Sequence, residues 1–140
     1  MVDQILRVNV DILVIKDGKI LFGLLTKDWN YQGKQVYGVP GSDIRFGEKI
    51  GETIRRNIKE EIGCSIIKYK IICVNANHAL GNHYIGIGAI AEIDGEPKNK
   101  MPEEWVKWEW FGKDEIPDNL FPPARNLMEC YLKNKFNISE

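Results

Sequence analysis

One helix-forming segment lies in the middle of a chain whose other segments mostly favour β-strands. Residues 48–62 repeat isoleucine at helical spacing and are followed by Gly63, the residue type that helices favour just past their last turn. The segments on either side are rich in valine, isoleucine and aromatic residues and are separated by Gly-, Pro- and Asp-containing turns. This order predicts an α/β fold in which helices pack on the faces of a mixed β-sheet.

The length and the turn signals predict a single domain over residues 1–140. A chain of 140 residues is short for two domains, yet long enough to bury a core without disulfides. Asp17-Gly18 is a typical hairpin turn, and the prolines at 122 and 123 suit the first turn of a closing helix. The predicted strands are 5–15, 19–25, 36–39, 65–74, 83–93 and 107–111, and the predicted helices are 48–62 and 122–135.

Composition excludes several classes of protein. The chain has 20 Asp and Glu against 19 Lys and Arg, whereas nucleic-acid-binding domains usually carry a clear positive excess. It lacks the run of about 18 apolar residues that spans a membrane, and its first residues do not form a secretory signal. Its three cysteines are widely spaced, which fits buried free thiols. We expect a cytoplasmic protein with neither a nucleic-acid polymer nor a membrane as partner.

A glutamate falls on the apolar face of the mid-chain helix. On a wheel of about 100° per residue that starts at Ile50, the isoleucines span about 120° and Glu61 falls at about 20°. Asn57 lies at the edge of this stripe, and Glu60 and Arg56 adjoin it. A buried carboxylate is costly unless it is paired or binds a cation. Glu61 is therefore either satisfied by Arg56 or the backbone, exposed at the helix end, or functional.

The flanking residues distinguish these readings. Pro40 and Gly41 precede a series of charged, apolar and glycine positions at fixed spacing. Its members are Ser42, Glu48, Arg56, Ile58, Glu60, Glu61, Gly63 and Cys64. This series resembles the Nudix box, G-x5-E-x7-R-E-U-x-E-E-x-G-U, in which U is an apolar residue. Segments 108–111, 116–117 and 121–124 look like the C-terminal half of MutT-like members, so the resemblance covers most of the chain.

The resemblance implies an α/β/α sandwich, a hydrolase and a divalent cation. Nudix enzymes use Mg²⁺ or Mn²⁺ to hydrolyse a nucleoside diphosphate linked to another group, and the cation neutralises the pyrophosphate before water attacks. Hard cations take oxygen ligands, which here would be Glu60, Glu61 and the Gly41 carbonyl. Arg56 would orient the cluster, and Glu48 would pair with it or hold an outer metal through water. The family also implies a nucleotide substrate and a homodimer.

Two positions depart from the family pattern. Ser42 replaces glycine, which strains the loop only if that residue needs a positive φ. Asn57 replaces a glutamate that in the family binds metal or acts as the general base. Its amide oxygen can still bind Mg²⁺, but an amide cannot accept a proton at neutral pH. Asn57 is therefore a candidate metal ligand, and we expect the affinity for the cation to be lowered.

Three explanations of the missing glutamate stay open. The general base comes from elsewhere, the metal-bound water reacts slowly without one, or the protein binds nucleotides without hydrolysing them. The candidate bases are Glu60, Glu92, Glu103 and Glu104, and the predicted catalytic residues are Glu60, Arg56, Glu48 and Glu104.

Aromatic and basic residues supply a candidate substrate pocket. Phe121 sits where related MutT-like enzymes stack a base, and flat rings bind bases without reading sequence. Arg125 stands where the family has a guanine-reading asparagine, which argues against oxidised guanine as the substrate. The candidates are Phe121, Tyr37, Arg125 and Lys27, followed by Trp29, Tyr31 and Arg7; for each aromatic, core packing is the alternative.

Two further pairs have structural as well as functional readings. His78 and His83, with no cysteine nearby, fit surface histidines better than a zinc site. Gly86 and Gly88 share one face of a predicted strand, which indicates close approach by a ligand or tight packing against a helix.

Overall fold

The computed structural model describes residues 5–79 and 81–138, apart from the side chain of residue 79. The first residues, on which the prediction of no secretory signal rests, lie outside this range. The elements are β1 (Leu6–Lys16), β2 (Lys19–Leu25), the 3₁₀ turn η1 (Lys27–Trp29), β3 (Tyr37–Gly38), β4 (Gly41–Asp43), α1 (Ile50–Ile62), β5 (Ser65–Ala79), β6 (Asn82–Asp94), β7 (Trp105–Gly112) and α2 (Pro122–Lys133).

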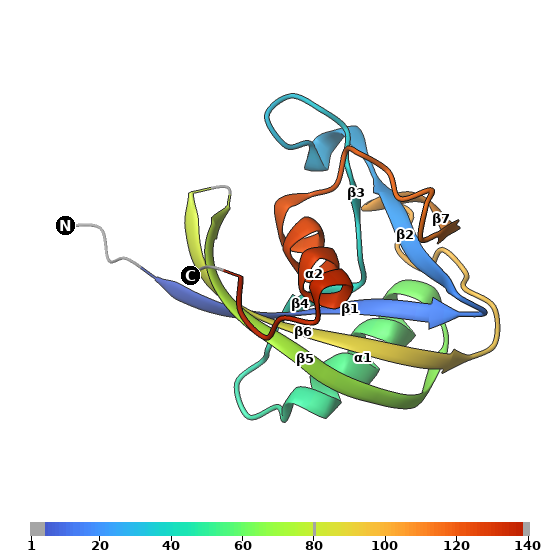
Figure 1. Ribbon diagram of the computed structural model, residues 1–140, viewed down its shortest axis with the longest axis horizontal. Coiled ribbons are helices and arrows are strands. Elements are labelled where there is room, and N and C mark those ends of the chain that lie inside the picture. Colours follow the sequence, from blue (N-terminus) through green and yellow to red (C-terminus); the bar gives the residue numbers. More distant parts are fainter. Residues whose placement is uncertain (1–4, 80, 139–140) are drawn as a thin grey trace.

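A mixed sheet separates the two helices (Figure 1). Its strand order is β3-β2-β1-β6-β5, with β4 paired to β1 and β7 paired to β2. The β1–β6 pair is parallel and the other pairs are antiparallel. Helix α1 packs on one face and α2 on the other, so the predicted α/β/α sandwich is confirmed.

Strand β1 contributes to both cores because its side chains alternate between the faces of the sheet. Val10, Ile12 and Val14 are fully buried in the cluster that contains the isoleucines of α1. Leu13 is buried in the second cluster, beside Leu127 of α2. By the same alternation, the two polar residues at positions 9 and 11 face the α2 side.

Several predicted local features are confirmed. Asp17 and Gly18 both take positive φ, 52° and 76°, and connect β1 to β2 as a hairpin. Gly63 caps α1 in the left-handed conformation, where a Cβ would be costly. At Gly88 a Cβ would lie 2.4 Å from Leu127 and 2.5 Å from Cys73, so its role is tight packing against α2. Neither described helix is long and apolar enough to cross a membrane.

Some predicted boundaries were wrong. Helix α1 begins at Ile50, because Glu48 belongs to the preceding loop, where it binds Arg56. Strand β5 continues to Ala79, because it stays paired with β6 up to their connecting turn. Helix α2 ends at Lys133, because Asn134 takes a left-handed φ of 52°. The short strand β4 was not predicted, since a Gly-Ser-Asp segment has little β-propensity.

Candidate active site

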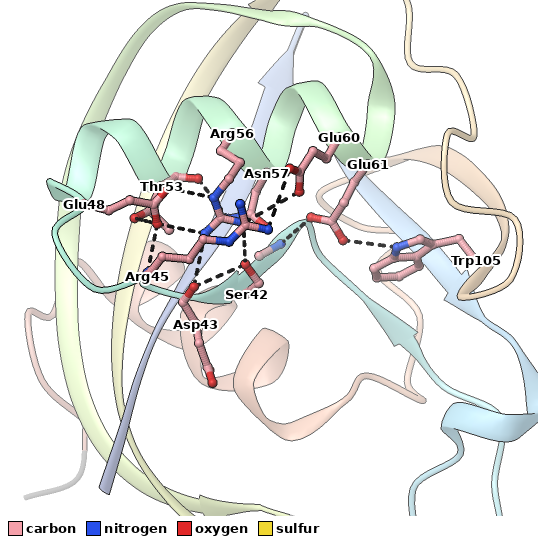
Figure 2. Close-up of polar contacts among 11 residues, drawn as sticks. Ser42, Asp43, Arg45, Glu48, Thr53, Arg56, Asn57, Glu60, Glu61 and Trp105 are labelled. Atoms are coloured by element: carbon pink, nitrogen blue, oxygen red, sulfur yellow. Dashed lines mark hydrogen bonds and ion pairs between the residues drawn. The ribbon is translucent and has the colours of Figure 1, made fainter.

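An arginine–glutamate pair joins helix α1 to the loop before it (Figure 2). Arg56 Nε and Nη2 donate to the two carboxylate oxygens of Glu48 at 2.7 and 2.9 Å, and both side chains are mostly buried. Glu48 also accepts bonds from the Arg45 backbone N–H and the Thr53 hydroxyl, each at 2.9 Å. Arg56 lowers the pKa of Glu48 to about 2, so this carboxylate stays charged at neutral pH.

The same guanidinium fixes the loop that precedes Glu48. Arg56 donates to the Asp43 carbonyl at 3.2 Å and to the Ser42 hydroxyl at 3.3 Å. Ser42 is absent from the described residues with positive φ, so the serine at the first box position causes no backbone strain. The loop therefore tolerates serine at this position, and Arg56 holds helix and loop together as one unit.

Glu61 lies inside the protein, as the helical wheel predicted. Only 3% of the residue is exposed, and its oxygens accept bonds from the Gly41 backbone N–H at 2.8 Å and the Trp105 indole N–H at 3.1 Å. Burial raises the pKa of Glu61 to about 8, and the charge of Glu104 adds to the effect. Two donors leave lone pairs on this carboxylate, which is costly to charge unless a cation compensates it.

Asn57 and Glu60 flank Glu61 on the helix in different environments. Asn57 is 2% exposed, and its amide nitrogen donates to the Thr53 carbonyl at 2.8 Å, so its oxygen is the atom suited to a cation. The side chain of Glu60 is 47% exposed and lies 3.6 Å from Arg56 and 3.8 Å from Arg45. Of the two predicted acidic ligands, Glu60 is therefore the one that lies close to Arg45 and Arg56.

A cavity of about 180 Å³ lies beside this helix–loop unit. Gly41, Ser42 and Asp43 form part of its wall, and Glu104 lines it at the entry to β7. Burial, followed by the charge of Glu103, raises the pKa of Glu104. The charge of Glu104 in turn adds to the effect of burial in raising the pKa of Glu61, so Glu104 acts electrostatically on the carboxylate of helix α1.

Asn9 and Asp11 line the cavity from β1, and sequence reasoning missed both. Asn9 Nδ2 donates to Asp11 Oδ2 at 2.7 Å, and burial raises the pKa of Asp11 to about 7. Asp11 Oδ1 would lie 2.7 Å from a Cβ at position 41, so glycine is required there. Polar residues at alternate positions of a Val- and Ile-rich strand were the signal that could have identified this pair.

We expect Asp11→Asn to stabilise the metal-free protein above pH 7. A carboxyl whose folded-state pKa is raised destabilises the fold increasingly between its ordinary pKa, near 4, and about 7. The amide keeps an acceptor for Asn9 and removes the charge of this partly buried side chain, which should raise the free energy of unfolding by about 1–3 kcal/mol. Chemical unfolding between pH 4 and 8 measures this gain, and Asp114→Asn, at an exposed site, is the control. An equal gain at pH 4 would contradict the assigned cause.

The predicted substrate residues divide into two groups. Phe121 and Trp29 line the cavity, and Tyr31 contacts the Phe121 ring edge-on with centroids 5.9 Å apart. Tyr37 instead packs on Phe111 in the core, and Lys27 is exposed in η1. Lys27, Tyr37, Arg125 and Arg7 are not among the residues that line the cavity: Arg125 donates to the carbonyls of Asp118 and Leu120, and Arg7 pairs with Asp43.

The candidate bases are also separated. Glu92 pairs with Lys68 at 3.7 Å on the strands away from the cavity, and Glu103 is exposed. His78 and His83 stack across the β5–β6 pair with centroids 4.4 Å apart and lie away from the cavity. Of the glutamates predicted outside the Nudix helix, Glu104 is the one that lines the cavity.

Comparison with known proteins agrees with this geometry. The sequence model of the NUDIX domain matches residues 5–131, nearly the whole described chain. The chain belongs to the NUDIX family. This match confirms the resemblance drawn from the box, and with it the prediction of a Nudix enzyme.

Individual Nudix relatives are distant in sequence but similar in fold. An RNA pyrophosphohydrolase of Orientia tsutsugamushi (strain Boryong) is 24% identical, over 94% of this chain and 90% of that protein. A MutT NUDIX hydrolase from Burkholderia pseudomallei superposes with a TM-score of 0.80 at 25% identity, over 90% of this chain and 98% of that one. The MutT protein from Methanosarcina mazei Go1 gives 0.79 at 16% identity, over 95% and 97%.

Nudix hydrolases generally use divalent cations, and the donor set here fits one of them. Glu61 and Glu60 offer carboxylate oxygens and Asn57 an amide oxygen, the ligand types that Mg²⁺ and Mn²⁺ prefer. In residues 5–79 and 81–138, no three His, Cys, Asp or Glu side chains converge as a ligand cluster. The side chain at position 57 is neutral, whereas a glutamate there would add a third carboxylate to the same helix face as Glu60 and Glu61.

Proposed function

We propose that this Nudix enzyme hydrolyses a pyrophosphate bond in a nucleoside di- or triphosphate, or in a nucleoside diphosphate conjugate, with Mg²⁺. The observation that carries this proposal is the buried Glu61 carboxylate, which lies beside Gly41 at the edge of an aromatic-lined cavity. A carboxylate in that position has no stabilising role of its own, because burial already raises its pKa to about 8. A bound cation would compensate the negative charge of Glu61, which otherwise destabilises the fold.

The metal ligands proposed are Glu61, Glu60, the Gly41 carbonyl and the Asn57 amide oxygen. When bound, Mg²⁺ would neutralise the pyrophosphate and stabilise the charge that develops on it. The Glu48–Arg56 pair acts on the protein rather than on the substrate: it holds helix α1 against the loop of Gly41 and Ser42. Such rigid positioning supplies much of the rate in phosphoryl transfer.

Glu104 is the proposed general base. Its carboxyl lines the cavity and is half-buried, and burial raises its pKa toward the range in which a carboxylate can accept a proton from water. Asn57 cannot take this role, and Glu92 lies away from the cavity in a pair with Lys68. Glu104 would receive the proton of the attacking water. Phe121 and Trp29 would stack on the nucleobase of the substrate.

The alternative function is nucleotide binding without turnover. The observation that favours it is Asn57, which leaves the helix one carboxylate short of the family pattern. The nucleotide would then bind in the same cavity and against the same aromatic rings. The ligands would carry too little negative charge to hold the cation during hydrolysis.

A nucleotide panel with Mg²⁺ in ¹⁸O-water tests the proposal. It includes nucleoside di- and triphosphates, nucleoside diphosphate conjugates and, because of the Orientia relative, an RNA with a 5′-triphosphate. We expect release of a phosphate or pyrophosphate from at least one small nucleotide, with the label showing the attacked phosphorus. Glu104→Gln should lower that turnover about 100-fold, within the usual range for general bases. Glu92→Gln is the matched control, and silence across the panel favours the binding protein.

The assembly, the location and the domain count stay predictions. We propose a cytoplasmic homodimer with a single domain, on the resemblance and composition described above. Light scattering during size-exclusion chromatography would measure the assembly directly.

A further inference from the structure

Trp105, the first residue of β7, connects the cavity to the Nudix helix. Its ring lines the cavity, and its indole N–H donates to Glu61 Oε1 at 3.1 Å (Figure 2). The residue is 3% exposed, like Glu61, so the bond is shielded from water. A hydrogen bond to a charged group in such surroundings is stronger than one between neutral groups.

Two strand glycines make room for this indole. At Gly23 of β2, a Cβ would lie 2.5 Å from Trp105 and 2.8 Å from Trp108. At Gly38 of β3, it would lie 3.2 Å from the far edge of the Trp105 ring. The Trp108 ring packs against the Trp105 ring, with centroids 4.2 Å apart. Two glycines and a second indole thus fix the direction of the Trp105 N–H.

Of the negative charge that the ligands would supply to the proposed cation, Glu61 provides a larger share in this chain than in the family pattern. Position 57 is neutral, and Glu60 is half-exposed among arginines, so Glu61 is the buried carboxylate on which the proposed cation depends. Among the described residues, its two donors are the Gly41 backbone N–H, a main-chain group, and the Trp105 indole N–H. Only the second donor depends on the identity of a side chain.

We propose that Trp105 is a positioning residue for the metal site: its indole N–H holds Glu61 in the orientation that binds the cation. This inference rests on the proposed function, because it takes Glu61 as a metal ligand. In this role Trp105 would act on the cation through Glu61 rather than as a ligand. It supports the acidic ligand from the wall of the cavity, as outer-shell partners do in other metal sites.

Trp105→Phe tests the proposal, because it keeps an aromatic ring and removes the donor. We expect Mn²⁺ to bind about tenfold more weakly by water proton relaxation, within the usual range for outer-shell partners. The Mg²⁺ concentration for half-maximal turnover should rise by the same factor, with kcat at saturating Mg²⁺ within about twofold. Trp110→Phe is the matched control, since Trp110 lies on the same strand, packs against the core of α1 and is not among the residues that line the cavity. Equal Mn²⁺ affinity in the Trp105 and Trp110 variants would overturn the proposal.

A measurement on the unmodified protein covers the case in which Trp105→Phe does not fold. The indole N–H resonances can be assigned from single Phe variants of Trp29, Trp108 and Trp110, which leaves Trp105 by elimination. Added Mg²⁺ should shift the Trp105 resonance and leave that of Trp110 nearly unchanged, whereas an unmoved Trp105 resonance would overturn the proposal. If Glu61→Gln binds Mn²⁺ normally, the proposed function itself fails; if only the Trp105 measurements fail, the positioning role alone is wrong.

Discussion

Glu61→Gln should abolish Mn²⁺ binding over the whole measurable range. The glutamine keeps the size of the side chain but replaces one carboxylate oxygen with an NH₂ group, which cannot bind a cation. The remaining oxygen must serve either Gly41 or Trp105, both of which now donate to Glu61. The variant therefore loses the buried negative charge and one of its two hydrogen bonds. Calorimetry or water proton relaxation with Mn²⁺ measures the loss.

The fold of this variant should survive. Removal of the ionisable carboxyl stabilises the metal-free protein at neutral pH, since the pKa of Glu61 lies near 8 in the folded state and near 4.5 outside it. The unsatisfied N–H costs about 1–3 kcal/mol and offsets that gain. We therefore expect a small change in melting temperature beside a complete loss of metal binding. Undiminished Mn²⁺ binding would refute the role of Glu61 as a ligand.

Glu60→Gln is the control on the same helix. Glu60 lies beside Glu61 in sequence, but its side chain is 47% exposed and near two arginines. Exposed charges contribute less than buried ones because water and salt screen them. Its glutamine variant should weaken Mn²⁺ binding without abolishing it. Equal losses in the two variants would mean that burial does not distinguish these carboxylates.

The sequence predicted the helix of this site better than its surroundings. The isoleucine period placed Glu61 on the buried face, and Gly63 marked the end of α1, because both signals depend on residues within a few turns. The pairing of Glu48 with Arg56 was one of two roles considered for Glu48. It follows from the box, in which the two positions stand at a fixed spacing.

The cavity wall could not be predicted because it is formed by residues far apart in the sequence. Asp11 comes from β1, Glu104 from the residue before β7, Trp105 from the start of β7, and Phe121 from the residue before α2. Only the pairing of strands brings them together, and sheet topology is not encoded in any local period. Tyr37 shows the same limit from the other direction. It is an aromatic residue of the type expected in a nucleotide pocket, but it packs in the core against Phe111.

Asn57→Glu should raise Mg²⁺-dependent turnover at least about tenfold if the amide is the limiting defect, on the scale that general bases contribute. Asn57 precedes Glu60 and Glu61 by three and four residues, so a carboxylate there points to the same helix face as both. The variant would restore the third acid of the box and should bind Mn²⁺ more tightly. Steady-state rates across a Mg²⁺ titration measure both effects.

The same substitution should destabilise the metal-free protein. Position 57 is 2% exposed, and a third carboxylate beside Glu61 adds a buried charge that repels its neighbours. We expect a loss of about 1–3 kcal/mol in the free energy of unfolding without metal, and recovery of most of it with Mg²⁺. Asn57→Gln is the control, because it matches the length of glutamate without its charge.

The outcome decides between the three explanations of Asn57. A gain with glutamate and none with glutamine would assign the defect to the missing charge or base at this position. Equal rates in all three proteins would contradict that assignment and point to a base elsewhere, which Glu104→Gln then tests. No turnover in any of them, with nucleotide binding intact, would identify the chain as a binding member of the family, because even a restored acid cluster would not support the reaction.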